Sequence, residues 1–160
     1  MIKSPSALRV LRLNSKIKME IRTPQNQQEW DAYYDLRYRI LRAPWNQPRG
    51  SERNEQDAIA IHLACFESGK ILGVARLDTE SDEFAQVRFV AVDDSAQGKG
   101  VGKKIMLSAE QNARLLGYKL MMLQARENAI PFYLSLGYTQ KEKTHLLFDE
   151  IQHWRMEKEI

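Results

Sequence analysis

The sequence predicts a single α+β domain built on one mixed, mostly antiparallel central sheet flanked by helices. Three strand-like segments between residues 58 and 92 are joined by short turns, Ser68-Gly69 among them, and short turns favour antiparallel pairing. A glycine-rich loop, a helix and another apolar strand follow, and this order gives one parallel crossover. The 160 residues, 43% of them hydrophobic, suffice for one domain with a sizeable core.

The first half of the chain begins with a strand and a helix. Residues 19–22 alternate as a short strand does. From Trp30 to Leu41, apolar residues recur at spacings of three and four, which predicts an amphipathic helix that ends before Pro44. The remaining elements expected in this half are a polar loop and three strands, at residues 43–57, 58–67, 70–78 and 84–92.

The second half alternates helices and strands. A helix follows the glycine loop and carries one apolar stripe as far as Leu116, before Gly117, a residue that commonly ends helices. The further elements expected are a buried strand, a short helix closed by Gly137 and two final strands, at residues 119–125, 129–136, 139–148 and 151–160.

The composition excludes several classes of protein. Cys65 is the only cysteine, so no intramolecular disulfide can form, and a reducing, cytoplasmic location is expected. Cys65 lies in an apolar segment, where a small buried side chain is expected rather than a nucleophile. The three histidines lack paired metal-ligand spacing, so no metal is expected. No apolar run approaches the roughly 18 residues of a membrane span, so no membrane partner is expected.

Charge is distributed unevenly along the chain. Residues 1–18 hold five basic residues and no acidic one, whereas residues 19–160 hold 19 basic and 21 acidic residues. We interpret residues 1–18 as a basic, flexible N-terminal extension and residues 19–160 as the folded domain. A start codon at Met19 and an organelle transit peptide are alternative interpretations of this segment. The nearly neutral domain gives no electrostatic reason to expect nucleic-acid binding.

A glycine-rich turn, Gln97-Gly98-Lys99-Gly100-Val101-Gly102, separates the strand that ends near Val92 from the next helix. Glycine removes side chains where a ligand must approach the backbone. The first amides of a helix lack internal partners and attract anions. Lys99, Lys103 and Lys104 add positive charge. The turn therefore predicts a ligand that carries phosphate.

Two common nucleotide motifs do not fit this turn. A P-loop needs GxxxxGK[ST], but Gly98 and Gly102 are one residue too close, and Lys104 stands where a Ser or Thr would hold magnesium. A dinucleotide-binding fold needs GxGxxG at the start of a βαβ repeat, whereas this turn reads GxGxG after hairpin strands.

The pattern Gln97-x-x-Gly100-x-Gly102 resembles the pyrophosphate signature (Gln/Arg)-x-x-Gly-x-(Gly/Ala) of the GCN5-related N-acetyltransferases (GNAT). The preceding residues 89–93 resemble the splayed strand of that family. The resemblance implies a GNAT domain over residues 19–160, with a splayed parallel strand pair and acetyl-CoA as cosubstrate. The residues that it implies for acetyl-CoA binding are Val90, Ala91, Val92, Gln97, Gly98, Lys99, Gly100, Val101, Gly102, Lys103 and Phe132.

A second segment adds to the resemblance. The pattern Ala129-x-x-Phe132-Tyr133-x-x-x-Gly137-Tyr138 is similar to the strand–helix block of the family. The family role carried onto Tyr133 is that of catalytic general acid, which protonates the leaving coenzyme A thiolate. Arg126 stands where many members have asparagine, and it is expected to face the acceptor or the coenzyme. Asn128, two residues later, is expected to cap the helix.

The general base is left open by the sequence. Many relatives carry a glutamate on the strand before the glycine turn, but Gln86 and Arg88 stand there in this chain. The resemblance implies that a backbone amide near Val90, on the splayed strand, is the hydrogen-bond donor to the thioester carbonyl. The candidates for the base are His62, Glu150, His153 and a water relay.

The acceptor pocket is expected between the first helix and the loop that follows it. Arginines there favour an acceptor that carries a carboxylate or phosphate, and Arg76 and Arg88 on strands are further candidates for this role. The aromatic and basic residues concentrated in that region are Tyr34, Arg37, Tyr38, Arg42 and Trp45.

The resemblance implies an N-acetyltransferase that transfers the acetyl group of acetyl-CoA to a primary amine of a small molecule by direct attack. A protein acetyltransferase acting on a lysine or an N-terminus, and a non-catalytic acyl-CoA sensor, are the alternatives. No nucleic-acid partner is expected. Dimers are common in the family, so a homodimer is among the expected assemblies.

Overall fold

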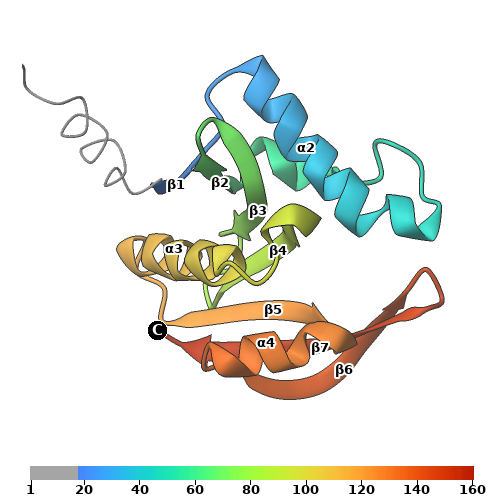
Figure 1. The fold of residues 1–160 in the computed structure, drawn as a ribbon. Helices are drawn as coiled ribbons and strands as arrows, with labels where there is room; N and C mark the ends of the chain where they lie inside the picture. The colour runs from blue at the N-terminus through green and yellow to red at the C-terminus, as the bar shows by residue number, and fades with distance from the viewer. Residues whose placement is uncertain (1–17) are drawn as a thin grey trace, which may run out of the picture.

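The computed structural model describes residues 18–160, so all but Lys18 of the predicted basic extension lies outside the described residues. Helix α2 covers one face of a seven-stranded sheet, and α3 and α4 cover the other (Figure 1). The strands and helices are β1 (Met19–Arg22), α2 (Gln27–Leu41), β2 (Ile61–Glu67), β3 (Lys70–Asp78), β4 (Ala85–Val92), α3 (Val101–Leu115), β5 (Leu120–Arg126), α4 (Ile130–Ser135), β6 (Thr139–Leu147) and β7 (Ile151–Glu159).

Among residues 18–160 the strand order is β1-β2-β3-β4-β5-β7-β6, and only β4 and β5 pair in parallel. The predicted α+β class and its single parallel crossover are therefore confirmed. Residues 18–160 contain no helix with the length and apolar character that a membrane span needs. The same residues contain no grouping of three His, Cys, Asp or Glu side chains suited to a metal ion.

Two local predictions were wrong. Strand β2 begins at Ile61 instead of residue 58, because residues 55–58 form a 3-10 turn. Asn54 and Asp57 stabilise that turn with a reciprocal capping box. Asn128 caps no helix, because it lies inside the 3-10 turn Glu127–Ala129 and α4 has no side-chain cap.

The sheet is buried on both faces at its centre. Along β2, Leu63 and Cys65 belong to the core under α3, while Ala64 and Phe66 belong to the core under α2. This alternation follows from the two-residue period of a strand. Cys65 is fully buried, as expected.

Strand β4 leaves its parallel partner halfway along its length. It pairs with β5 only from Ala85 to Val87. Beyond that point β4 contains a bulge, in which Phe89 and Val90 lie opposite the single residue Ala75. Phe89 has a positive φ of 53°, which turns the strand sharply. The two strands therefore diverge (Figure 1), and β5 continues beside β7.

Candidate active site

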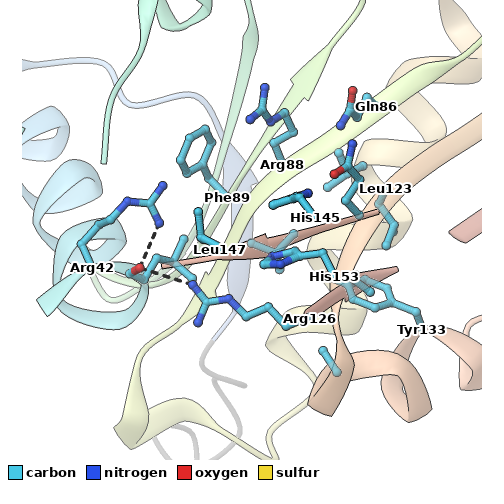
Figure 2. A pocket seen from close by; sticks show the side chains of 16 residues that line it. Arg42, Gln86, Arg88, Phe89, Leu123, Arg126, Tyr133, His145, Leu147 and His153 are labelled. Atoms are coloured by element: carbon cyan, nitrogen blue, oxygen red, sulfur yellow. Dashed lines mark hydrogen bonds between the residues drawn. The ribbon is translucent and has the colours of Figure 1, made fainter. Parts of the chain in front are cut away.

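A cavity of about 210 Å³ lies where β4 and β5 diverge (Figure 2). Its wall combines the end of α2 with both diverging strands, α4 and the last hairpin, which are far apart in the sequence. The lining residues are Leu41, Arg42, Gln86, Val87, Arg88, Phe89, Val90, Leu123, Gln124, Ala125, Arg126, Ala129, Tyr133, His145, Leu147 and His153.

The glycine turn begins α3 with open donor groups. Gly98 and Gly100 have φ values of 77° and 78°, and a Cβ at either position would meet no atom within 4 Å. The cap residue Gly100 makes no side-chain hydrogen bond, and among residues 18–160 the amides of residues 101–103 donate to no acceptor. Free amides at a helix N-terminus form an anion site. Lys99 and Lys103 are exposed beside it.

Gly102, in the first turn of α3, is where the glycine turn packs against α4. A Cβ at Gly102 would lie 3.1 Å from the Phe132 ring and 3.7 Å from a methyl group of Val92. The glycine therefore lets α3 approach α4 closely at Phe132, which is the neighbour of Tyr133 in the sequence. Ala91 and Val101 have side chains buried in the core, so only their backbone atoms can contact a ligand.

Tyr133 projects from α4 into the cavity wall (Figure 2). Its ring packs edge-on against Phe132 and Tyr138. The hydroxyl makes no hydrogen bond to any residue from 18 to 160, so it is available to a ligand. Burial raises the pKa of Tyr133, and the nearby charge of Arg126 opposes this shift. The phenol is therefore protonated at neutral pH.

His153 on β7 lines the same cavity, together with His145 on β6. The Nδ1–H group of His153 donates to the Ile151 carbonyl at 3.0 Å, so the Nε2 atom of the neutral ring carries the free lone pair. Burial lowers the pKa of His153. The charges of Arg126 and Arg42 act in the same direction.

The other two candidates for the base lie elsewhere. His62 is buried, with its Nε2–H group donating to the Asp57 carbonyl at 2.8 Å and its Nδ1 atom 2.8 Å from the Tyr33 hydroxyl. Both ring nitrogens are thus engaged. Glu150 lies in the exposed turn between β6 and β7 and does not line the cavity.

The region expected to form the acceptor pocket contributes little to this cavity. Of its five residues, only Arg42 lines the wall, and Arg88 on β4 joins it. Arg37 is fully buried and pairs with Asp57 at 2.8 Å, and the fully buried Arg76 pairs with the same carboxylate at 3.0 Å. The expectation that Arg37 and Arg76 meet the acceptor is therefore wrong. Tyr34 lies beside a separate surface hollow, and Tyr38 and Trp45 do not line the cavity.

Phe89 connects this buried network to the bulge. Its ring lies under the guanidinium groups of Arg37 and Arg76, at 4.5 and 4.8 Å from the ring centroid. Cation–π attraction of this kind favours a fixed ring position. The network therefore holds the bulged residue next to Val90.

Sequence reasoning missed His145 as a cavity residue. Strand β6 shifts register between Lys143 and Leu146, so that residues 144 and 145 face the single residue His153. No local pattern in residues 139–147 signals that shift. A histidine in each of two adjacent strands was the only available signal.

Comparisons with known proteins agree with this geometry. Residues 46–160 match the family model described as "Acetyltransferase (GNAT) domain". The chain is 28% identical over 129 residues to the uncharacterized N-acetyltransferase YjcF of Bacillus subtilis (strain 168), covering 81% of this chain and 91% of that protein. It is 30% identical over 112 residues to the UPF0039 protein C11D3.02c of Schizosaccharomyces pombe, covering 68% and 74% of the two chains.

A solved structure has the same fold. An acyl-CoA N-acyltransferase from Pseudomonas aeruginosa superposes with a TM-score of 0.76 at 21% sequence identity. The match covers 89% of this chain and 99% of that one.

Proposed function

Since the chain belongs to the GNAT family of acetyltransferases, we propose that it transfers the acetyl group of acetyl-CoA to the primary amine of a small molecule. Family membership makes the chain an acetyl-CoA-dependent N-acetyltransferase. The proposal depends above all on one observation, which is that Tyr133 and His153 line a single cavity between the diverging strands β4 and β5.

The residues present fit acetyl-CoA. The free amides of residues 101–103 and the open, left-handed glycines suit the pyrophosphate, with Lys99 and Lys103 beside it. The pantetheine arm is assigned to the backbone of residues 90–92, where β4 has left β5. Phe132 packs against Gly102 and directly precedes Tyr133, which lines the cavity.

In the proposed reaction, His153 accepts a proton from the acceptor ammonium and passes it to solvent. The free amine nitrogen attacks the thioester carbonyl carbon and forms the new carbon–nitrogen bond. The carbon–sulfur bond then breaks, and Tyr133 donates its proton to the departing sulfur. The nitrogen then loses its second proton to solvent, and the Tyr133 phenolate takes up a proton from solvent, which restores its hydroxyl.

The raised pKa of Tyr133 keeps the acid protonated but makes it a weaker donor. The burial that raises the pKa of this phenol also destabilises a thiolate in the same cavity, which raises the pKa of the coenzyme A thiol. The two raised pKa values offset each other in the proton transfer. The carbonyl oxygen is assigned to the backbone amide of Val90, which the bulge at Phe89 turns out of the regular ladder.

The cavity size suits a small acceptor. Ligand pockets usually measure about 300–1,000 Å³, whereas this one measures about 210 Å³, so a small amine would fill it. A non-catalytic sensor needs neither a phenol without a protein partner nor a histidine with a free Nε2 atom in the cavity. Both features favour transfer chemistry.

The test measures thiol release from acetyl-CoA with a panel of small primary amines and with two peptides, one offering a lysine and one a free N-terminus. We expect at least one small amine to exceed background hydrolysis more than tenfold and to exceed both peptides. Faster release with a peptide would support a protein acetyltransferase instead. Release at the background rate with every amine, despite coenzyme A binding, would support the sensor.

A further inference from the structure

We infer that Arg42 and Arg126 form an anion-binding subsite in the cavity, and that the acetyl acceptor is an amine that also carries a carboxylate or a phosphate. The inference rests on the proposed function in taking this cavity as the acceptor site. It adds the chemical class of the acceptor.

The two arginines converge from distant parts of the chain. Arg42 follows the last turn of α2, and Arg126 ends β5. Both donate to one backbone oxygen, the Leu41 carbonyl, from Nη1 of Arg42 at 2.9 Å and from Nη2 of Arg126 at 3.3 Å (Figure 2). Their guanidinium groups are therefore close together at one end of the cavity.

Each guanidinium is held in place by a further contact. The Nε–H group of Arg42 donates to the Ser51 carbonyl at 3.0 Å. The guanidinium of Arg126 lies over the Trp45 ring, 4.4 Å from its centroid. Within residues 18–160, Nη2 of Arg42 and both Nε and Nη1 of Arg126 donate to no acceptor. These positioned N–H groups are free to bind a ligand.

Neither arginine forms an ion pair with a carboxylate in the described part of the chain, and the Glu52 carboxylate acts on Arg42 only from a greater distance, where it raises the pKa that burial lowers. No Asp or Glu lines the cavity, and neither Arg42 nor Arg126 forms an ion pair there. The two fully buried arginines both have carboxylate partners, since Arg37 and Arg76 share Asp57 and Arg76 also binds Asp78 at 2.6 Å. Two half-buried arginines without a carboxylate partner in a cavity wall are therefore an exception among residues 18–160.

The electrostatic state of the cavity favours an anion. Burial, together with the charge of Arg42, lowers the pKa of Arg126 to about 10. Arg88, the third arginine in the wall, is 4.0 Å from Asp78 and adds further positive charge. A carboxylate or phosphate between Arg42 and Arg126 would relieve their repulsion, and the planar guanidinium fork matches both groups.

The position of the pair sets where the acceptor amine lies. Arg126 faces His153 across the paired strands β5 and β7, and its charge also acts on Tyr133. An acceptor anchored by its anion at Arg126 can therefore place its amine near the proposed base. The small cavity volume favours a short spacer between the two groups.

Binding is tested first, on the chain saturated with coenzyme A so that phosphate groups cannot occupy the glycine turn. Calorimetry compares β-alanine with β-alaninamide, and phosphoethanolamine with ethanolamine. We expect each anionic amine to bind at least tenfold more tightly than its neutral match. The first pair tests recognition of a carboxylate, and the second pair tests recognition of a phosphate. Equal affinity within both pairs would overturn the inference.

Variants then locate the effect. Arg126→Gln and Arg42→Gln should each weaken binding of the preferred anionic amine at least tenfold and change its neutral match less than twofold. Arg126→Lys should restore part of the loss. Arg49→Gln is the matched control, because Arg49 is exposed and pairs with Asp35 outside the cavity. Equal losses for the anionic and neutral amines would indicate a merely structural role and contradict the subsite.

Turnover of the same four amines separates this inference from the proposed function. Selective binding of the anionic amines without acetylation would support the subsite and contradict the transferase proposal for these acceptors. Acetylation with equal kcat/KM for each anionic amine and its neutral match would support the transferase and overturn the subsite.

Discussion

The imidazole rings of His145 and His153 stack, with centroids 4.3 Å apart and planes 14° apart. The bulge in β6 produces this contact by placing two residues opposite His153. Burial first, and then the charge of His145, lower the pKa of His153. The stack therefore helps to keep the proposed base unprotonated near neutral pH.

The first prediction concerns the pH dependence of kcat/KM for the acceptor at saturating acetyl-CoA, because this ratio reports the titration of the chain before the acceptor binds. His153 can accept a proton only when it is neutral, so kcat/KM should fall as pH falls through its pKa. Because that pKa is lowered, the midpoint should lie below the ordinary histidine value of about 6.5. Initial rates from pH 5 to 8 measure this midpoint.

Two variants test whether His153 causes this fall of activity at low pH, which is the acid limb of the profile. His153→Gln should lower kcat about 100-fold and remove the acid limb. His145→Gln removes a neighbouring charge, so it should shift the midpoint to higher pH. An unchanged acid limb in His153→Gln would assign the titration to another group.

The second prediction concerns Tyr133. Tyr133→Phe should lower kcat about 100-fold and leave KM for acetyl-CoA nearly unchanged, because the hydroxyl is assigned to the departing sulfur. Tyr138→Phe is the control, since its hydroxyl donates to Glu110 in the core, away from the cavity. The control should lose about 1.5–3 kcal/mol of stability, because its hydrogen bond goes to a buried carboxylate, and retain its activity. Full turnover by folded Tyr133→Phe would exclude the phenol as the acid.

The third prediction concerns the glycine turn. Gly100→Ala forces a side chain into the left-handed region, at a cost of about 1–2 kcal/mol, and crowds the pyrophosphate. KM for acetyl-CoA should rise at least tenfold. Gly69→Ala in the β2–β3 turn is the matched control, because Gly69 has a φ of 77° and equally open space. If both variants lose coenzyme A affinity equally, strain alone accounts for the effect.

The fourth prediction concerns the buried ion network. Asp57→Asn leaves the buried Arg37 and Arg76 without their shared carboxylate, so the free energy of unfolding should fall by about 3 kcal/mol. Asp35→Asn removes exposed pairs with Arg39 and Arg49 and should cost less than about 1 kcal/mol. Urea unfolding measures both values. Equal losses would show that the network contributes no more than surface pairs do.

Local patterns predicted much of this fold. The Ser68-Gly69 turn fixed the β2–β3 hairpin, and both residues adopt positive φ values, as a tight hairpin turn requires. The period of residues 30–41 predicted α2, and the glycine spacing predicted the anion site at the start of α3. Each of these features depends on residues that are neighbours in sequence.

The rest depends on pairings across the chain. Arg37 is buried because Asp57, in the 3-10 turn, pairs both with it and with Arg76 on β3, and no periodicity reports such a network. The bulge at Phe89 and the register shift beside His145 are set by the partner strands. Sequence patterns could therefore name Tyr133 and His153 but could not show that they share a cavity.

The transfer of an acetyl group is tested most directly with acetyl-CoA labelled with carbon-13 in its acetyl group. The measurement is the amount of label recovered in the amine, compared with the thiol released in the same reaction. We expect the two amounts to be equal for a small primary amine, and both to fall together in Tyr133→Phe. Thiol release without label in any amine would contradict the proposed function.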